Sequence, residues 1–414
     1  MAAEKISGQH QMDFLADFDY IRAAGTPDEK KAALQIQRTL ESLGVENRLE
    51  EFTFETFRIK KAKLLVMQPY QKEYTVTAYG RCADTAKMGL CAPFLYVENG
   101  DAISLKQAKG KIVMLNDAVK TEMYQKLVNA GAEGFITICG TPLDEGEDLK
   151  PRAYRLPEKL QAAMPGCAIH YKDAVELVTK GASKICLQIE QESVSATSQN
   201  VIARIPGTDR AQEILTLTAH YDSVAAGPGA YDNMAGAAVI MELCRYFQVH
   251  RPRRTLEFIW FGAEEEGLLG SQSYVNTHSD ELFQHVFHMN VDLAGQLVGG
   301  NVFGVTAGTK VCEVLMEIAV ETGIGTSLKN QIWGSDSNTF AWKGIPAMTL
   351  NRDGFGMHTR HDTLDLISAW SLERSALLLG HLAERLANAD EMPFERNMPE
   401  KFTQELDRYF AVAH

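Results

Sequence analysis

The stretch Ile214-Leu-Thr-Leu-Thr-Ala-His-Tyr-Asp-Ser-Val224, followed after a glycine-rich turn by Tyr231-Asp-Asn-Met-Ala-Gly236, is the part of the chain from which the fold is deduced. The apolar residues that precede His220 predict a β-strand, and the residues after the second motif have helical spacing. His220 lies two residues before Asp222 and twelve before Asp232. A histidine and carboxylates at the end of a strand are typical of a metal site.

Length and charge limit the kinds of protein this chain encodes. With 414 residues it is long enough for two domains, and 45% apolar with 23% charged residues is an ordinary globular composition. The net charge of −13 argues against a nucleic-acid partner, because phosphate binding needs a basic face. We find no apolar run of membrane-spanning length and no secretory signal, which predicts no membrane association. We therefore expect a cytoplasmic location, or secretion if a signal has been trimmed away.

The cysteines give a further expectation about the compartment. Seven cysteines are scattered along the chain without a CxxC pair. An odd, scattered set predicts neither a disulfide framework nor a thiolate zinc site. We therefore expect reduced cysteines, as in a cytoplasm.

Alternating strand and helix patterns define the main part of the chain. Thr26-Pro-Asp-Glu29 predicts a capping box at the start of a helix that extends to Leu43, and a strand follows over 45–57. From Asn200 onward, near-continuous apolar strands alternate with helices. The expected strands are 201–205, 214–219, 255–261, 288–291 and 345–350, and the expected helices are 236–247, 311–321 and 372–387. The pattern predicts an α/β fold with a mixed, mainly parallel sheet sandwiched by helices.

The pattern changes between residues 59 and 191. This segment predicts short strands at 111–115, 134–139, 167–170 and 185–189, with helices at 122–130 and 173–179. It contains no metal-type constellation of its own. We interpret 1–58 with 192–414 as one domain and 59–191 as an inserted, smaller α/β domain.

Polar residues follow three further strands of the expected sheet. Glu264-Glu-Glu266 comes after the strand that ends at Phe261, Asp292 follows the strand 288–291, and His358 lies in the loop after Leu350. Ligand sites of open α/β sheets lie at the carboxyl ends of strands, so these groups should converge. Taken singly, a triple glutamate is usually a solvated helix start, and a loop histidine usually lies on the surface. Their shared placement favours a metal-dependent hydrolase.

The residue types suit a centre of two metal ions. Imidazoles and carboxylates are zinc ligands, and two ions about 3.5–4 Å apart need a carboxylate that bridges them. Asp232 is the natural bridge, since it follows a flexible turn and lies near a helix start. Asp222 lies two positions beyond His220 on the same face and can orient its ring. One of the adjacent glutamates must stay free as a general base.

These motifs resemble a known family. His220-Tyr-Asp-Ser-Val, Tyr231-Asp-Asn-Met-Ala-Gly, the segment from Phe261 to Ser271, Asn290-Val-Asp and His358-Thr-Arg-His-Asp-Thr occur in the order found in di-zinc exopeptidases of peptidase clan MH. The sequence is most similar to the aminopeptidase Y and glutamate carboxypeptidase family. The similarity covers the N-terminal helix and about Asn200 to the C-terminus, and it implies the zinc exopeptidase fold.

The resemblance implies a role for each polar residue. The implied ligands of two Zn²⁺ ions are His220, Asp232, Glu265, Asp292 and His358. His220 and Asp292 would bind one ion, Glu265 and His358 the other, and Asp232 both.

Two catalytic residues are implied as well. Asp222 would orient His220, and Glu264 would be the general base. Glu266 leaves open a shift of the base and the ligand by one position, and His361 is an alternative to His358. The substrate-binding residues remain unknown.

The implied activity is that of an aminopeptidase, which removes N-terminal residues from peptides through a water bound by two zinc ions. A carboxypeptidase or dipeptidase of the same fold is the first alternative, because Arg352 and Arg360 flank His358 and could bind a free carboxylate. An aminoacylase-type enzyme of the same clan fits less well, because the interval from Asp292 to His358 is too short for its dimerisation domain. A non-catalytic receptor or scaffold homologue is a further alternative. The oligomeric state stays open.

The inserted segment has a looser resemblance of its own. Gly110-Lys-Ile-Val-Met-Leu115 and Ala130-Gly-Ala-Glu-Gly-Phe-Ile-Thr137 are similar to a protease-associated domain. In the family such a domain borders the active-site cleft. This resemblance implies that 59–191 is a protease-associated domain within a zinc peptidase.

Overall fold

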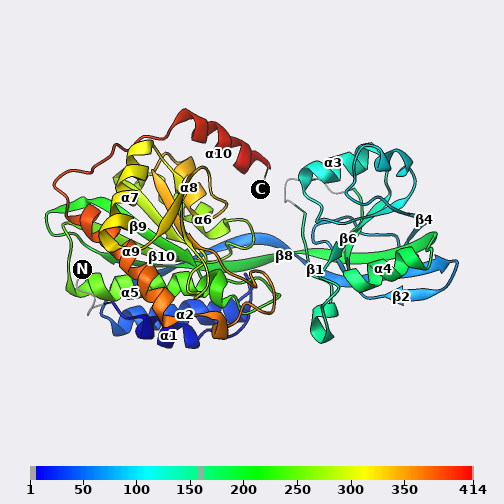
Figure 1. Cartoon of the computed structure of the whole chain (residues 1–414), viewed down its shortest axis with the longest axis horizontal. Coiled ribbons are helices and arrows are strands. Elements are labelled where there is room, and N and C mark those ends of the chain that lie inside the picture. The colour runs from blue at the N-terminus through cyan, green and yellow to red at the C-terminus, as the bar shows by residue number, and fades with distance from the viewer. Residues whose placement is uncertain (1–5, 157–159, 161–162, 413–414) are drawn as a thin grey trace. The chain divides into compact units, whose positions relative to one another are not determined.

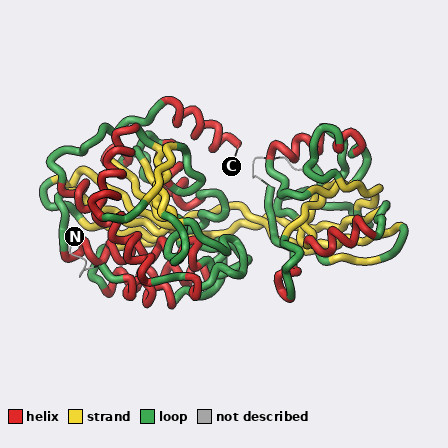
Figure 2. The backbone as a smooth tube through the Cα atoms, viewed as in Figure 1, coloured by secondary structure: helices red, strands yellow, loops and turns green. Residues whose placement is uncertain are grey.

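The computed structural model describes residues 6–156, 160 and 163–412, which form two compact units. The larger unit runs to Phe54 and resumes from Ala196 to Phe410, and the smaller one comprises Glu55–Ser195. Each unit has its own hydrophobic core. Figure 1 labels many of the elements of both units, and Figure 2 shows where helices and strands lie along the chain.

A mixed sheet forms the centre of the larger unit. Its strands follow the order β13 (Thr326–Asn330), β12 (Asn301–Thr306), β14 (Ala347–Arg352), β11 (His285–Val291), β9 (Arg210–His220), β10 (Arg254–Phe261) and β8 (Lys184–Ile205). β9 is parallel to both β10 and β11, and β11 is parallel to β14. β12 and β8 are antiparallel to their neighbours β14 and β10. The parallel centre brings the carboxyl ends of four strands to one edge.

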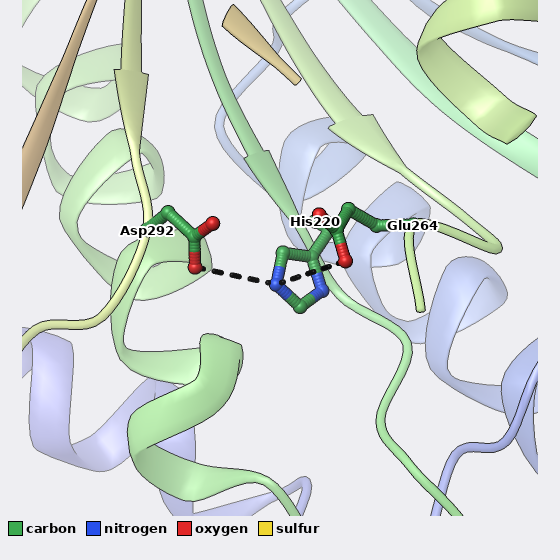
Figure 3. A group of neighbouring side chains, drawn as sticks. All are labelled: His220, Glu264 and Asp292. Atoms are coloured by element: carbon green, nitrogen blue, oxygen red, sulfur yellow. Dashed lines mark ion pairs between the residues drawn. The ribbon is translucent and has the colours of Figure 1, made fainter. Parts of the chain in front are cut away.

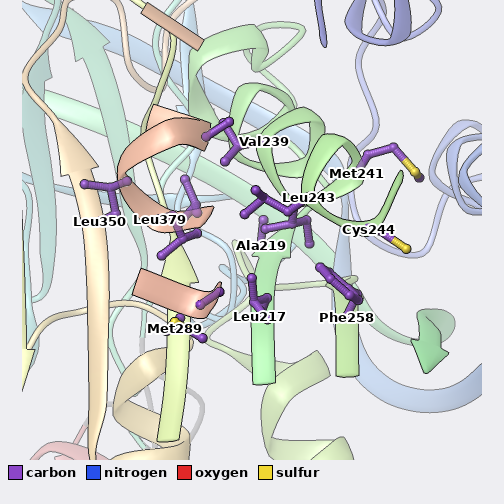
Figure 4. Close-up of a cluster of buried hydrophobic side chains, with 14 of the residues drawn as sticks. Leu217, Ala219, Val239, Met241, Leu243, Cys244, Phe258, Met289, Leu350 and Leu379 are labelled. Atoms are coloured by element: carbon purple, nitrogen blue, oxygen red, sulfur yellow. The ribbon is translucent and has the colours of Figure 1, made fainter. Parts of the chain in front are cut away.

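Helices cover both faces of this sheet. The first face carries α1 (Gly8–Ala16), α2 (Pro27–Ser42), α5 (Ala235–Val249), α7 (Thr309–Thr322) and α9 (Ala369–Asn388). The second carries α6 (Leu269–Thr277) and α8 (Ser337–Trp342), on which α10 (Glu400–Val412) packs. Alternate residues of β9, such as Leu217 and Ala219, enter the first core, where they lie near α5 (Figure 4). The mixed α/β sandwich predicted from the sequence is thus confirmed.

The second face of the sheet contains buried polar residues. Thr216 Oγ1 lies 2.7 Å from His285 Nδ1, and Thr218 Oγ1 lies 2.9 Å from His288 Nε2. Burial lowers the pKa of His285 to about 4 and that of His288 well below its usual value. Both rings are therefore neutral members of the core, and one nitrogen of each ring is hydrogen-bonded to a threonine hydroxyl.

The smaller unit contains a second α/β arrangement. Its strands are β2 (Lys72–Tyr74), β3 (Val76–Ala78), β4 (Leu90–Tyr96), β5 (Ile112–Leu115), β6 (Gly134–Cys139) and β7 (Gly166–His170), and its helices are α3 (Thr121–Asn129) and α4 (Tyr171–Thr179). β4 to β7 run parallel, while β3 pairs antiparallel with β7. β1 (Asn47–Gln68) and β8 each contribute residues to both units.

Two expectations need correction. The strands predicted at 185–189 and 201–205 are the two ends of one continuous strand, β8, because the polar residues between them keep an extended backbone. The expectation that the cysteines are reduced is wrong for Cys91 and Cys186, which form a disulfide. The antiparallel register of β4 and β8 places these two residues opposite each other, a proximity that their separation of 95 residues hides. The remaining five cysteines are free.

Among the residues described, no helix combines the length and the apolar character needed to cross a bilayer.

The core predicts how stability depends on β9. Leu217→Ala should lower the free energy of unfolding by about 2–5 kcal/mol, because the side chain is fully buried and leaves a cavity. Leu34→Ala is the matched control, since Leu34 is 38% exposed, and should cost about 0.5 kcal/mol. Urea denaturation followed by tryptophan fluorescence measures both, because all four tryptophans belong to the larger unit. Equal losses for the two variants would contradict this core assignment.

Candidate metal centre

Two groups of potential metal ligands lie at the carboxyl edge of the larger unit's sheet. His220, Glu264 and Asp292 form one group, and their nearest ligand atoms lie within 4.8 Å of one another. The second group consists of Asp232, Glu265 and His358, with the same limit. Figure 3 shows the first group, in which Asp292 and Glu264 both approach the Nε2 atom of His220.

Strand ends bring the first group together. His220 is the last residue of β9 and pairs with Phe261 at the end of β10, three residues before Glu264. Asp292 follows β11 directly, and its backbone N–H donates to Leu350 of β14. Parallel pairing therefore aligns residues that lie 28 to 72 positions apart in the sequence.

Asp232 lies between the two histidines. Its Oδ1 is 3.2 Å from Nε2 of His220, and its Oδ2 is 3.0 Å from Nε2 of His358. His358 Nε2 is also 3.1 Å from Glu265 Oε1, and His220 Nε2 is 3.5 Å from Asp292 Oδ1. One carboxylate thus presents an oxygen to each group, which is the arrangement required of a ligand shared by two ions.

Negative charge is concentrated at this site. Burial and the neighbouring carboxylates Asp292, Asp336 and Glu265 raise the pKa of Glu264 well above its usual value. Burial and Asp232 likewise raise the pKa of Glu265. Like charges at short range in a buried site raise each other's pKa, and a cation bound among them would offset the repulsion.

The histidines respond in the opposite direction. Although burial alone would lower it, hydrogen bonds with Asp232 and Glu265 raise the pKa of His358 to about 10. The pKa of His220 is also raised, because Glu264, Asp222, Asp232 and Asp292 outweigh burial. The donor set of imidazole nitrogens and carboxylate oxygens fits zinc.

Asp222 is fully buried beside His220. Its Oδ1 lies 3.5 Å from His220 Nδ1, and its two oxygens accept hydrogen bonds from the backbone N–H groups of Glu264 (3.0 Å) and Glu265 (3.2 Å). Asp222 thus contacts three of the predicted site residues at once.

Other buried side chains hold the site in place, and the sequence analysis did not single them out. Asp362 accepts from the backbone N–H groups of Tyr231 (2.6 Å) and Asp232 (3.0 Å). Asn233 Nδ2 donates to Val291 O (2.7 Å), and its Oδ1 accepts from Leu293 N (3.1 Å), so it holds both neighbours of Asp292. Both residues lie inside motifs quoted above, and those motifs were the signal in the sequence that could have identified them.

Arg22 and Asp336 had weaker signals in the sequence. Arg22 is fully buried and donates to Tyr221 O (2.7 Å), Pro228 O (2.6 Å) and Gly229 O (3.0 Å), thereby fastening both ends of the turn after His220. No pattern around Arg22 distinguishes it. Asp336 follows Gly334-Ser335 and precedes a buried helix. Burial raises the pKa of Asp336 to about 7.

The two alternatives left open by the sequence can be compared with this geometry. Within the described part of the chain, the two groups contain His358 and not His361. They likewise contain Glu264 and Glu265 and not Glu266.

Comparison with known proteins places this geometry in a family. Aminopeptidase YwaD of Bacillus subtilis is 29% identical over 349 residues, which cover 81% of this chain and 69% of the relative. Carboxypeptidase Q of Mus musculus is 23% identical over 416 residues, covering 92% and 86%. The structure of BSAP, a zinc aminopeptidase from Bacillus subtilis, matches with a TM-score of 0.79 and 25% identity over 95% of this chain and 98% of the other.

A solved Peptidase M28 precursor from Shewanella amazonensis matches with a TM-score of 0.76 and 26% identity, covering 96% of this chain and 97% of the other. The family described as peptidase family M28 matches residues 200–383, which include every residue of the two ligand groups. The predicted relationship to zinc exopeptidases is thereby confirmed: residues 200–383 of this chain match peptidase family M28.

Proposed function

We propose that this protein is a zinc-dependent aminopeptidase with two zinc ions. The observation that carries the proposal is the position of Asp232, whose two oxygens lie 3.2 Å from Nε2 of His220 and 3.0 Å from Nε2 of His358. The names of two similar proteins, an aminopeptidase and a zinc aminopeptidase, support the reaction and the metal.

The roles proposed for the ligands follow from the two groups. His220 and Asp292 would hold one ion, Glu265 and His358 the other, and Asp232 would be shared. Asp222 would orient His220 and, through its bonds to the backbone, the two glutamates. Bound zinc ions would lower the pKa of a water molecule and polarise the peptide carbonyl.

Glu264 is the proposed general base. It belongs to the His220 group, yet its Oε2 lies 4.0 Å from His220 Nε2, farther than the corresponding oxygens of Asp232 and Asp292. From this position it would take a proton from the attacking water and return it to the leaving amine. The side chain is partly open to solvent, with 12% of its surface exposed, so a substrate can reach it.

A carboxypeptidase or dipeptidase is the second candidate function. Carboxypeptidase Q of Mus musculus matches more of this chain than aminopeptidase YwaD does, although at lower identity. We favour the aminopeptidase because two similar proteins, aminopeptidase YwaD and the zinc aminopeptidase BSAP, are named for that activity. A non-catalytic homologue is disfavoured, because a full set of ligand types is present.

Several finer assignments also remain proposals. We regard the smaller unit as a protease-associated domain and the peptide substrate as the only partner implied by the family, with the oligomeric state open. The cytoplasmic location expected from the sequence relied in part on reduced cysteines. The Cys91–Cys186 disulfide favours a compartment that keeps thiols oxidised.

Replacing the base tests the reaction. Glu264→Gln should lower kcat by about 10²- to 10⁴-fold, because the amide cannot accept the proton. Bound zinc should stay at the wild-type level, as measured by atomic absorption on the purified protein. Wild-type activity would reject Glu264 as the base, and loss of zinc together with activity would make it a ligand.

Zinc stoichiometry and its pH dependence test the two-ion site. The wild type should bind two zinc ions per chain, and His358→Ala should retain one. Zinc must displace the proton of His358, whose pKa is about 10 in the metal-free protein. The apparent affinity should therefore rise from about pH 6 to about pH 8 in a chelator competition assay, and this rise should be smaller in His358→Ala. A single equivalent in the wild type would contradict the two-ion site.

A substrate panel separates the two candidate peptidase functions. Aminoacyl-anilides carry a free amine and no free carboxylate, whereas N-blocked dipeptides carry the reverse. An aminopeptidase should cleave only the first class, at kcat/KM values at least about 10²-fold higher. Preferential cleavage of the blocked dipeptides would replace the aminopeptidase with a carboxypeptidase.

A further inference from the structure

The turn from Gly262 to Leu268 contains Glu264 and Glu265, two of the proposed site residues. Other residues of this turn have an unfavourable backbone conformation. Ala263 and Leu268 have φ angles of 52° and 61°, in the left-handed region that disfavours residues with a Cβ atom. Inside the turn, Gly267 N and Leu268 N both donate to Glu264 O at 2.8 Å. The N–H groups of Ala263, Glu264 and Glu265 point elsewhere, so groups outside the turn must accept them.

Asp222 accepts two of these three N–H groups, those of Glu264 and Glu265. The third involves Glu29, on the first turn of α2. A hydrogen bond from the Ala263 backbone helps to hold down the pKa of Glu29, which burial and Asp222 nevertheless raise to about 8. Asp222 thus accepts from two consecutive backbone amides, and Glu29 lies against the backbone just before them.

Glu29 is placed unusually for a residue of a helix cap. Thr26 Oγ1 accepts from Glu29 N (3.2 Å), which is half of the capping box predicted from the sequence. The carboxylate of Glu29 does not complete the box at Thr26 N, which donates to Ala23 O instead. It accepts from Gly25 N (2.7 Å) and from Ser198 Oγ (2.5 Å), and the residue is fully buried.

Gly262 allows this carboxylate to approach the turn. A Cβ atom at position 262 would lie 2.8 Å from Glu29 Oε1 and 2.3 Å from Ser198 Oγ, both closer than real contacts. The backbone at the start of the turn thus passes directly against the Glu29–Ser198 pair. Burying an acid beside Asp222 is unfavourable, and the backbone amides it accepts compensate for that cost.

We propose that Glu29 is a positioning residue for the active site: its carboxylate fixes the backbone of Gly262 and Ala263, so that Glu264 and Glu265 reach their places. This inference rests on the proposed function only in giving Glu264 the role of base. Glu29 lies on α2, far from the ligands in sequence, and acts through the turn rather than on the substrate.

Two measurements on Glu29→Gln test this role. The amide offers one acceptor and adds donors that face the N–H groups of Gly25 and Ala263. Hydrogen exchange of the metal-free protein should speed up about tenfold in the peptide that covers 262–268. In the zinc-loaded enzyme, kcat for an aminoacyl-anilide should fall about 30-fold while KM stays within about twofold, because the base is displaced and the binding surface is kept.

Matched controls separate positioning from stability. Glu41→Gln changes an exposed glutamate of the same helix and should leave both readouts unchanged. Ile36→Val removes a methyl group from the fully buried face of α2 and should lower Tm without changing kcat or the exchange of 262–268. If Glu29→Gln does not fold, Ser198→Ala, which deletes one partner of the carboxylate, should give the same changes at smaller size.

The outcomes distinguish this inference from the proposed function. An inactive wild type would reject the aminopeptidase, while faster exchange at 262–268 in Glu29→Gln would still support the contact. If the wild type is active and Glu29→Gln changes neither kcat nor hydrogen exchange, the positioning role is overturned. Ser198→Ala takes the place of Glu29→Gln in this comparison if the first variant does not fold. A loss of Tm alone, like that of Ile36→Val, would also overturn it, because it would make Glu29 a residue of stability only.

Discussion

The crowding of carboxylates around His220 and His358 is the constraint on which the rest of this structure depends. Asp232, Glu264, Glu265 and Asp292 lie within reach of two imidazoles at a largely buried strand edge, and the pKa values of the two glutamates rise in consequence. Such a cluster costs free energy in the folded chain unless opposite charge is supplied. The histidines supply part of it when protonated, and divalent cations would supply more.

Backbone N–H groups also help to offset the negative charge of the buried carboxylates. Asp222 and Asp362 are buried acids, and each accepts from two consecutive N–H groups of a segment that carries ligand residues. Asn233 performs the same task with an amide side chain beside Asp292, and Arg22 fastens the turn after His220 through backbone carbonyls. The ligand segments are therefore linked to one another rather than only to the sheet, which keeps their side chains in place before any metal binds.

The sequence was sufficient for much of this architecture, for identifiable reasons. Near-continuous apolar strands such as 255–261 and the capped helix after Thr26 carry strong local signals, and the structure contains β10 and α2 at these places. Short or weakly patterned elements were missed, among them α6, α8 and the antiparallel strand β12. The cysteine argument failed because spacing along the chain says nothing about β4 and β8, whose register alone places Cys91 opposite Cys186. Glu29 was interpreted as half of a local cap, whereas its carboxylate reaches Ser198.

The sequence by itself determined the types of ligand, the order of the motifs that carry them and their position after strands, because all three can be read from residues that are neighbours in the chain. The tertiary structure decided which residues meet: Glu264 and Glu265 but not Glu266, and His358 but not His361, in the two groups of the described chain. It also decided that Asp222, Asp362 and Glu29 face backbone amides. The physical reason is that these distances are set by the parallel pairing of β9 with β10 and β11, and of β11 with β14, between segments far apart in sequence. No local periodicity encodes that pairing.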